Sequence, residues 1–301
     1  MSGAVNRTTM QSAALEQSLV LERRARLNRR LIVAGKLLIL VVLSAVIMGP
    51  VLTAFLGSLR TTGQFLSRPF GLPTAGIHWE NYTNILTGKA FWTAAQNSLI
   101  ITVGVATINI TLASMMAFAF SRVRFLGRSL LFNILSLGLL FPLVIALLPL
   151  FIQLRNLGLT NSLWGVILPL AAFGLPGSVV ILRSFFMAVP GELEDASYID
   201  GCTTLGFFRH ILLPISRPAL TAVVTMQIVV AWNEYFLPLL VLTNDKKWPL
   251  PLGIMQFMGQ YGWDYAGIMA YVTLLIIPAV IFYIVTEKYI VTGLTGGELK
   301  G

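Results

Sequence analysis

The sequence is 301 residues long, 56% hydrophobic and only 11% charged, with a formal net charge of +9. Soluble domains carry about 25% charged residues. This composition therefore excludes a soluble globule, a coiled coil and a disordered chain, and it predicts an all-α membrane protein that crosses the bilayer several times. We attribute the excess of positive charge to basic residues held on one side of a membrane rather than to a nucleic-acid partner.

The first thirty residues are polar and end in a run that is rich in arginine. No small-residue cleavage site follows a hydrophobic stretch of signal-peptide length. We therefore expect residues 1–30 to be a cytoplasmic tail, with a short amphipathic helix on the inner leaflet as one form of it.

Six later segments are apolar over roughly the 20 residues that a helix needs to cross a bilayer. They lack the alternation of a barrel strand, and a chain in lipid must satisfy its own backbone hydrogen bonds, so we predict a six-span helical bundle. Prolines within these segments predict bent, closely packed helices. The predicted spans are residues 31–59, 97–120, 130–154, 163–186, 219–242 and 266–285.

The basic residues are distributed unevenly over the predicted loops. If the N-terminus is inside, 15 of the 21 lysines and arginines fall on the inner side. This bias predicts that both termini are cytoplasmic. The six basic residues on the outer side are Arg60, Arg68, Lys89, Arg155, Lys246 and Lys247.

Catalytic motifs are absent from the sequence. It contains no G-x-x-x-x-G-K-[ST] loop for nucleotide phosphates, no H-E-x-x-H and no G-x-S-x-G. One cysteine, Cys202, and two distant histidines, His78 and His210, predict no disulfide and no metal site. We expect a non-catalytic chain without a cofactor of its own.

The predicted inner loop, residues 187–218, has the pattern of two short helices. Its acidic residues follow a proline, as in the first turns of a helix. Gly201 stands where a glycine would end that helix, and Thr203 or Thr204 can cap a second one. The acids are Glu192, Glu194, Asp195 and Asp200.

The second short helix should end at Pro214 and Pro218. Between them the two helices carry four large apolar side chains. These side chains lie at the lipid interface, or they form a docking surface for a cytosolic partner, because exposed apolar clusters rimmed by charge mark interaction sites. The residue pattern alone leaves both interpretations open. The four are Tyr198, Ile199, Phe207 and Phe208.

The spacing of this loop resembles the EAA loop of ABC importer permeases, E-A-A-x3-G-x9-I-x-L-P. Here it reads Asp195-Ala196-Ser197, Gly201, Ile211 and Leu213-Pro214. Asp195 replaces the glutamate and Ser197 replaces the second alanine, while the spacing is intact. Shorter stretches also resemble carbohydrate-uptake permeases of the maltose-type, binding-protein-dependent kind. They are residues 79–82, 97–98, 117–122, 157–159, 231–235 and 293–297.

The resemblance implies a type I ABC importer permease in the inner membrane of a bacterium or archaeon. Its transmembrane domain would cover residues 31–290, followed by a cytoplasmic tail of residues 291–301. The implied partners are a second permease subunit, two copies of a cytosolic ATPase that binds ATP and Mg, and an extracytoplasmic sugar-binding lipoprotein or periplasmic protein.

The resemblance also implies a role for the loop, which would be the coupling helix that sits in a cleft of the ATPase. The implied coupling residues are Glu194, Asp195, Ala196, Tyr198, Ile199, Asp200, Gly201, Leu205, Phe207, Phe208, Ile211 and Pro214.

Asn233 and Glu234 fall near the middle of the fifth predicted span, where an ionisable residue is costly and by default marks a functional site. One interpretation is an interhelical hydrogen bond that packs the helices. The other, which we favour, is the wall of a translocation cavity. Trp232, Tyr235 and Gln227 are further candidates, although neighbours on a helix point about 100° apart and cannot all face one cavity.

The predicted outer loop, residues 243–265, is rich in aromatic side chains. An aromatic belt at the membrane interface is one explanation. The resemblance implies another, a loop that reaches the docked binding protein through Trp248, Tyr261 and Trp263.

Together these features predict a transmembrane subunit of an ATP-driven, binding-protein-dependent sugar importer. It would form half of the translocation pathway and work by alternating access. A self-sufficient secondary carrier or channel is the alternative. That class favours inverted repeats or charged relays in several spans, and we find neither. The sequence does not name the sugar.

Overall fold

The computed structural model describes residues 2–74, 76–259 and 262–295 of the chain, whose backbone divides into two compact units, residues 1–56 and 57–301. The first unit is formed by helix α1 (Ser2–Ser58), which continues without a break through residue 30, the predicted boundary between tail and first span. From Leu31 to Ser58 this helix is apolar and long enough to cross a membrane.

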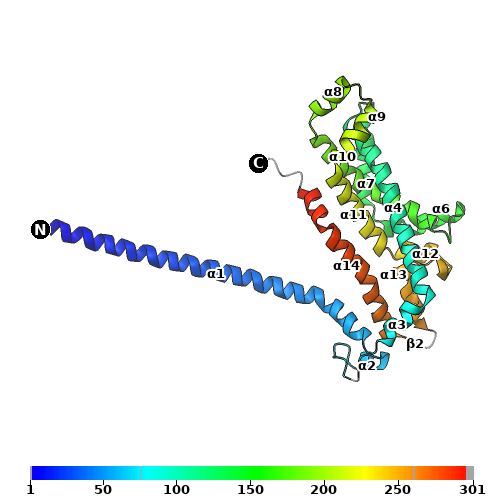
Figure 1. The fold of residues 1–301 in the computed structure, drawn as a ribbon, viewed down its shortest axis with the longest axis horizontal. Coiled ribbons are helices and arrows are strands. Elements are labelled where there is room, and N and C mark those ends of the chain that lie inside the picture. The colour runs from blue at the N-terminus through cyan, green and yellow to red at the C-terminus, as the bar shows by residue number, and fades with distance from the viewer. Residues whose placement is uncertain (1, 75, 260–261, 296–301) are drawn as a thin grey trace. The chain divides into compact units, whose positions relative to one another are not determined.

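The second unit is built around the helices α4, α7, α11 and α14, which pack together (Figure 1). Helix α4 (Lys89–Ser121) packs along α7 (Trp164–Ala188). Helix α11 (Arg217–Asn233) packs against both of them and against α14 (Tyr265–Thr295). The bundle thus combines segments from the predicted second, fourth, fifth and sixth spans.

Small side chains let α4 and α7 approach closely. Ala113 and Ala117 of α4 are fully buried. A Cβ atom on Gly104 would lie 3.1 Å from the side chain of Ile167 on α7. Close contact through small residues is the usual way in which membrane helices associate, because lipid offers no hydrophobic drive for it.

Short elements lie at the two ends of this bundle. Figure 1 places α8 and α9 at one end, and α2, α3 and β2 at the other. Their bounds, with those of the remaining short elements, are α2 (Thr62–Ser67), α3 (Glu80–Thr87), α8 (Gly191–Ile199), α9 (Thr204–Phe207), the π-helical turn η2 (Phe208–Leu212), α10 (Leu213–Ile215), η3 (Asp245–Lys247), α13 (Leu250–Gly253), η4 (Ile254–Phe257), β1 (Met258–Gly259) and β2 (Gly262–Trp263).

Within the described residues, four helices are long and apolar enough to cross a membrane, or up to six if each of two bent pairs is one span. The predicted third span, residues 130–154, is broken into two helices. Helix α5 (Arg128–Leu137) with η1 (Gly138–Leu140) meets α6 (Leu143–Asn156) at 103°. Pro142 ends the first helix because its ring holds Phe141 in extended backbone, φ −102° and ψ 100°.

The fifth predicted span is also interrupted. Helix α11 ends at Asn233, Glu234 is extended, and α12 (Phe236–Val241) follows. Pro238 explains the break, since its missing N–H and its ring exclude an α-helical bond to the carbonyl of Glu234, four residues earlier. At its other end, α11 meets the helical stretch Thr204–Ile215 at 77°.

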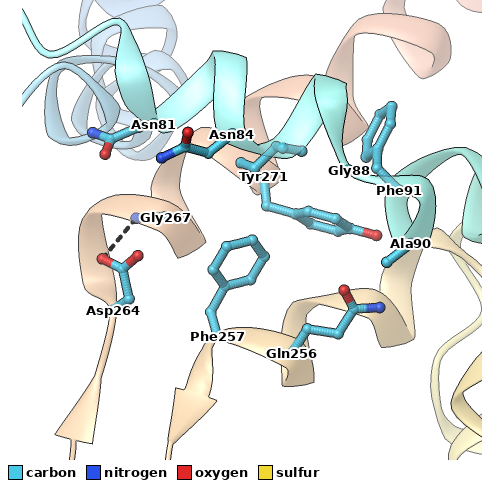
Figure 2. A pocket seen from close by; sticks show the side chains of 11 residues that line it. Asn81, Asn84, Gly88, Ala90, Phe91, Gln256, Phe257, Asp264, Gly267 and Tyr271 are labelled. Atoms are coloured by element: carbon cyan, nitrogen blue, oxygen red, sulfur yellow. Dashed lines mark hydrogen bonds between the residues drawn. The ribbon is translucent and has the colours of Figure 1, made fainter.

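The predicted outer loop contains a short hairpin, which no turn pattern in the sequence indicates. Met258 of β1 pairs with Trp263 of β2, and Gly259 pairs with Gly262. A pocket of about 260 Å³ opens beside this hairpin, between α3, the first turn of α4, η4 and α14 (Figure 2).

Candidate functional site

The loop between α7 and α11 has the two-helix form that the sequence predicts. Helix α8 ends at Ile199, and Gly201 follows with a positive φ of 81°. Its N–H donates to the carbonyl of Tyr198 at 3.1 Å, and the N–H of Cys202 donates to the carbonyl of Ser197 at 2.9 Å. This left-handed cap suits glycine, which lacks a Cβ, so the predicted helix end at Gly201 is confirmed.

The second short helix begins as predicted and ends differently. The hydroxyl of Thr203 accepts from the N–H of Gly206 at 3.1 Å, so Thr203, not Thr204, is the cap. Pro214 does not end the helix, which continues to Ile215. The π-helical turn η2 precedes Pro214. Pro214 has no N–H to donate to the preceding turn, so a regular α-helix would be interrupted at this place.

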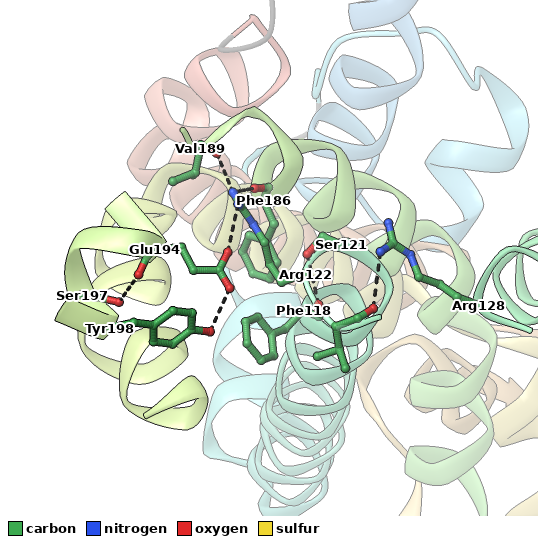
Figure 3. A network of polar contacts seen from close by, with 10 residues as sticks. Phe118, Ser121, Arg122, Arg128, Phe186, Val189, Glu194, Ser197 and Tyr198 are labelled. Carbon is green, nitrogen blue, oxygen red and sulfur yellow. Dashed lines mark hydrogen bonds and ion pairs between the residues drawn. The ribbon is translucent and has the colours of Figure 1, made fainter. Parts of the chain in front are cut away.

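An arginine at the end of α4 holds α8 against the bundle (Figure 3). Arg122 Nη1 lies 3.2 Å from Glu194 Oε2 in an ion pair, and both side chains are largely buried. Arg122 Nη2 donates to the carbonyls of Phe186, at 2.6 Å, and Val189, at 2.5 Å, where α7 ends. One guanidinium therefore joins α4, α7 and α8 through charge-assisted hydrogen bonds.

Glu194 also fixes the side of α8 that faces the bundle. Its Oε1 accepts from the hydroxyl of Tyr198 at 2.9 Å, one helical turn later. The hydroxyl of Ser197 donates to the backbone carbonyl of Glu194 at 2.7 Å, and Ser197 is the only residue of α8 that is buried. The hydroxyl of Ser197, the residue that replaces the second alanine of the EAA pattern, is therefore hydrogen-bonded within α8.

The loop also carries exposed apolar side chains on both of its short helices. Ile199 is 87% exposed and Leu205 is 69% exposed, one on each side of the Gly201 turn. Ala196 is exposed as well, and so are the acids Glu192, Asp195 and Asp200 of the first helix and its end. We call Ile199, Leu205 and these three acids the loop surface.

Phe207 and Phe208 do not belong to this surface, so the prediction that they are exposed contact residues is wrong. Phe207 is fully buried and Phe208 is 8% exposed. The ring of Phe208 lies 4.7 Å, centroid to centroid, from that of Phe118 on α4, and both phenylalanines belong to the core of the bundle together with Leu212. Burial of their large apolar area anchors the second helix. Ile211 is half-buried beside them.

The candidate pathway residues of the fifth predicted span lie where helix α11 ends, not inside one continuous helix. Asn233 is exposed, and its amide donates to the carbonyl of Val229 at 2.8 Å. Glu234 is half-buried, and its Oε1 accepts from the N–H of Leu237 at 2.9 Å, as a cap of α12 does. Trp232 and Tyr235 are half-buried on either side.

Gln227 lies deeper, in a buried polar group that joins three helices. Its Nε2 donates to the hydroxyl of Ser178 at 3.1 Å, and that hydroxyl donates to Asn109 Oδ1 at 2.7 Å. Asn109 in turn donates to the carbonyl of Ala171 at 2.9 Å. A Cβ atom on Gly174 would lie 2.3 Å from Gln227 Oε1 and 2.8 Å from Asn109 Nδ2, so a larger residue there would have to displace these amides. This arrangement is that of interhelical packing.

The three candidate contacts of the outer loop differ in their surroundings. Trp248 is half-buried, packs against the bundle and donates through Nε1 to the carbonyl of Leu242 at 3.1 Å. Trp263 is 49% exposed on the hairpin. Tyr261 lies outside the described residues.

The role of Arg122 is not evident from the sequence. Arg122 stands 72 positions before Glu194, so no local pattern links the two residues. The stretch of residues 117–122, noted only for its resemblance, was the one available signal. In the part of the chain that the structure describes, no group of three or more His, Cys, Asp or Glu residues could hold a metal ion.

Comparison with known proteins gives consistent matches. The model of the family described as "binding-protein-dependent transport system inner membrane component" matches residues 109–290. The diacetylchitobiose uptake system permease protein NgcG of Streptomyces coelicolor is 32% identical over 284 residues, which are 93% of this chain and 93% of that protein.

Two solved structures share the fold. A bacterial ABC transporter that imports the acidic polysaccharide alginate contains a chain with a TM-score of 0.76 and 23% identity, covering 86% of this chain and 96% of that one. A structure of bacterial alginate ABC transporter with a periplasmic protein that carries alginate pentasaccharide contains a chain with a TM-score of 0.60 and 14% identity, covering 88% and 95%.

Proposed function

The chain belongs to the family of binding-protein-dependent transport inner membrane components, as a permease of the carbohydrate-uptake kind, and we propose that its α8–α9 loop couples a cytosolic ATPase to the transport of a sugar. It is a multi-pass protein of the inner membrane and a non-catalytic component of its transporter. ATP and Mg would be bound by the ATPase.

The loop surface carries this proposal. Ile199 and Leu205 are exposed apolar side chains on the two sides of the Gly201 turn, and the exposed acids Glu192, Asp195 and Asp200 lie on the first helix and at its end. Arg122 and Glu194 fix this helix, α8, to the bundle. A partner that fits this surface has an apolar cleft with a basic rim. Because α8 is tied to α4 and α7, a movement of the docked ATPase would be passed to the helices that span the membrane.

This role sets the orientation of the chain. The end of the bundle with α8 and α9 would face the cytosol, and the end with α2, α3 and the hairpin would face outside. The distribution of 15 basic residues against six supports the same orientation, with both termini inside. Tags at residues 1 and 301 should then be protected from protease added to intact cells, and external labelling of either tag would contradict the orientation.

The complete importer would contain a second permease, two ATPase copies and an extracytoplasmic binding protein. The complex with a periplasmic protein, solved for the alginate transporter, supports the last of these partners. The exposed Trp263 of the hairpin lies at the proposed outer end and is a candidate contact with the binding protein. Trp248 would support that contact from within, through its bond to the loop backbone.

The pathway itself would run beside the break between α11 and α12. An extended Glu234 with exposed Asn233 interrupts the helix there, and irregular backbone at membrane depth occurs only where protein or a water-filled cavity surrounds it. Glu234 and Asn233 are the proposed wall residues, with Trp232 and Tyr235 beside them. Gln227 would act through helix packing.

The test is ATP hydrolysis by the purified complex, with and without the binding protein and its sugar. Stimulation that depends on this permease and disappears when the loop surface is changed supports the proposal. Transport by the purified chain alone would contradict it and identify a self-sufficient carrier instead.

A further inference from the structure

The connection between α4 and α5 is a second exposed feature at the α8 end of the bundle. Helix α4 ends at Ser121 and α5 begins at Arg128, and we call the connecting residues 122–127 the α4–α5 turn. The ion pair of Arg122 with Glu194 places this turn at the same end of the bundle as α8. The turn and Arg128 together contain three arginines and no acid, so this surface is basic where the loop surface is acidic.

The shape of the turn is fixed by contacts of its own. Gly127 has a positive φ of 79°, which suits a residue without a Cβ. The ring of Phe125 lies 6.2 Å, centroid to centroid, from that of Phe120 at the end of α4. Arg128 Nη1 donates to the carbonyl of Val123 at 3.4 Å (Figure 3). The turn is therefore an ordered element rather than a loose link between two helices.

One apolar side chain of this turn projects entirely into the surroundings. Leu126, between the two residues that fix the turn, is 100% exposed. Leu130, Ile134 and Leu137 are exposed as well, at the helical spacing that places them on one side of α5. Within α5, which is described throughout, no residue is buried. Leu126 thus stands at the start of an apolar helix side that suits lipid.

We propose that the α4–α5 turn binds the surface of an anionic phospholipid bilayer. The membrane-spanning segment of α4 ends at Ser121, so the turn begins where the chain leaves the membrane. Leu126 would lie among the acyl chains, because an exposed leucine gains free energy when it leaves water. Arg124, which is exposed, and Arg128, which is half-buried, would bond lipid phosphates through their guanidinium groups.

Charge favours lipid over the ATPase as the occupant. The loop surface calls for a partner with a basic rim, and a basic turn does not fit the same partner surface. Anionic headgroups supply the complementary charge, and the cytoplasmic leaflet has a negative surface potential. The inference rests on the proposed function for its placement in that leaflet, since the orientation of the chain comes from there.

Fluorescence quenching by spin-labelled lipids tests the proposal in the complete importer, reconstituted in nanodiscs. In a Cys202→Ser background, Leu126→Cys carries an apolar nitrobenzoxadiazole label. The quencher is a nitroxide on the upper acyl chain of phosphatidylglycerol or of phosphatidylcholine, at equal mole fractions. The label at position 126 should be quenched, and more strongly by phosphatidylglycerol. Leu205→Cys, exposed on the loop surface at the same end, is the control and should be quenched by neither lipid.

Arginine variants test the preference for the anionic lipid. Arg124→Gln should reduce the enrichment of phosphatidylglycerol at the label by up to about fivefold, as expected for one arginine at a charged surface. This variant leaves the bond between Arg128 and Val123 in place. Adding Arg128→Gln should remove the rest of the preference. Arg209→Gln with Arg217→Gln, at two exposed arginines of the inner loop, is the matched control and should retain it.

The outcomes separate lipid from protein contacts. A label at position 126 that neither lipid quenches overturns the proposal, and so does equal quenching by the two lipids. Quenching that appears only after the ATPase has been stripped from the membrane also overturns it, and makes the turn a contact of the ATPase. Stimulated ATP hydrolysis is measured on the same preparations. Its absence in the wild type contradicts the proposed function, while the quenching judges the turn independently.

Discussion

Replacing Gly201 by valine should uncouple the loop without unfolding the bundle. Gly201 has φ +81°, and a Cβ atom there would meet nothing within 4 Å. The penalty is therefore conformational, about 1–2 kcal/mol for a left-handed residue with a Cβ, and a β-branched side chain lies at the upper end of that range. An energy of this size reduces the population of the docking-competent turn by a factor of about 5–30.

The assay is binding-protein-stimulated ATP hydrolysis by the purified complex. The Gly201→Val variant should insert in the membrane and pair with the second permease. Its ATPase attachment, or its stimulated ATP hydrolysis, should fall by about the same factor of 5–30. Gly191→Val is the matched control, because Gly191 is exposed, begins the helix that Gly201 ends, and has open space around it without a positive φ.

Two further variants sharpen this experiment. Gly201→Asn should retain most activity, since asparagine tolerates the left-handed region. Asp195→Glu, which restores the EAA pattern on an exposed side chain, should have no effect. Normal stimulation by Gly201→Val in a complex of normal composition would refute the coupling role of this turn.

Three other changes follow from the contacts. Arg122→Ala should cost about 1–3 kcal/mol, because two backbone carbonyls lose their donor and Glu194 loses its ion-pair partner, and it should speed hydrogen exchange in α8; unchanged exchange would show that the ion pair does not hold this helix. Glu234→Leu should remove a cap worth about 1 kcal/mol and impair transport or alter sugar preference in an assembled complex, whereas Glu234→Gln keeps an acceptor; normal uptake by the leucine variant would exclude Glu234 from the pathway. Gly174→Ala should lower the thermal midpoint, because its Cβ would lie 2.3 Å from Gln227 Oε1, while Gly177→Ala, with its nearest neighbour at 3.7 Å, should not; equal midpoints would contradict the packing.

The coupling loop could be predicted closely because its signals are local. Gly201 ends one helix and Thr203 starts the next through bonds that reach at most five residues along the chain. The apolar segments likewise located the long helices α4, α7 and α14, since a span is defined by its own composition.

The errors arose where a distant contact or a proline decides the structure. Hydropathy alone did not show that Pro142 and Pro238 divide their segments into separate helices. Phe207 and Phe208 were predicted to be exposed, because the sequence does not show that they pack in the core of the bundle. There the ring of Phe208 contacts that of Phe118.

The central claim is that the loop surface docks on the ATPase, and site-directed cross-linking tests it most directly. In a Cys202→Ser background, Leu205→Cys places one thiol on the exposed centre of the surface. Ser67→Cys, exposed on α2 at the other end of the bundle, is the control. A thiol-directed photo-cross-linker attached at position 205 should capture the ATPase in native membranes, and one at position 67 should not. An intact importer in which position 205 captures no ATPase would contradict the account.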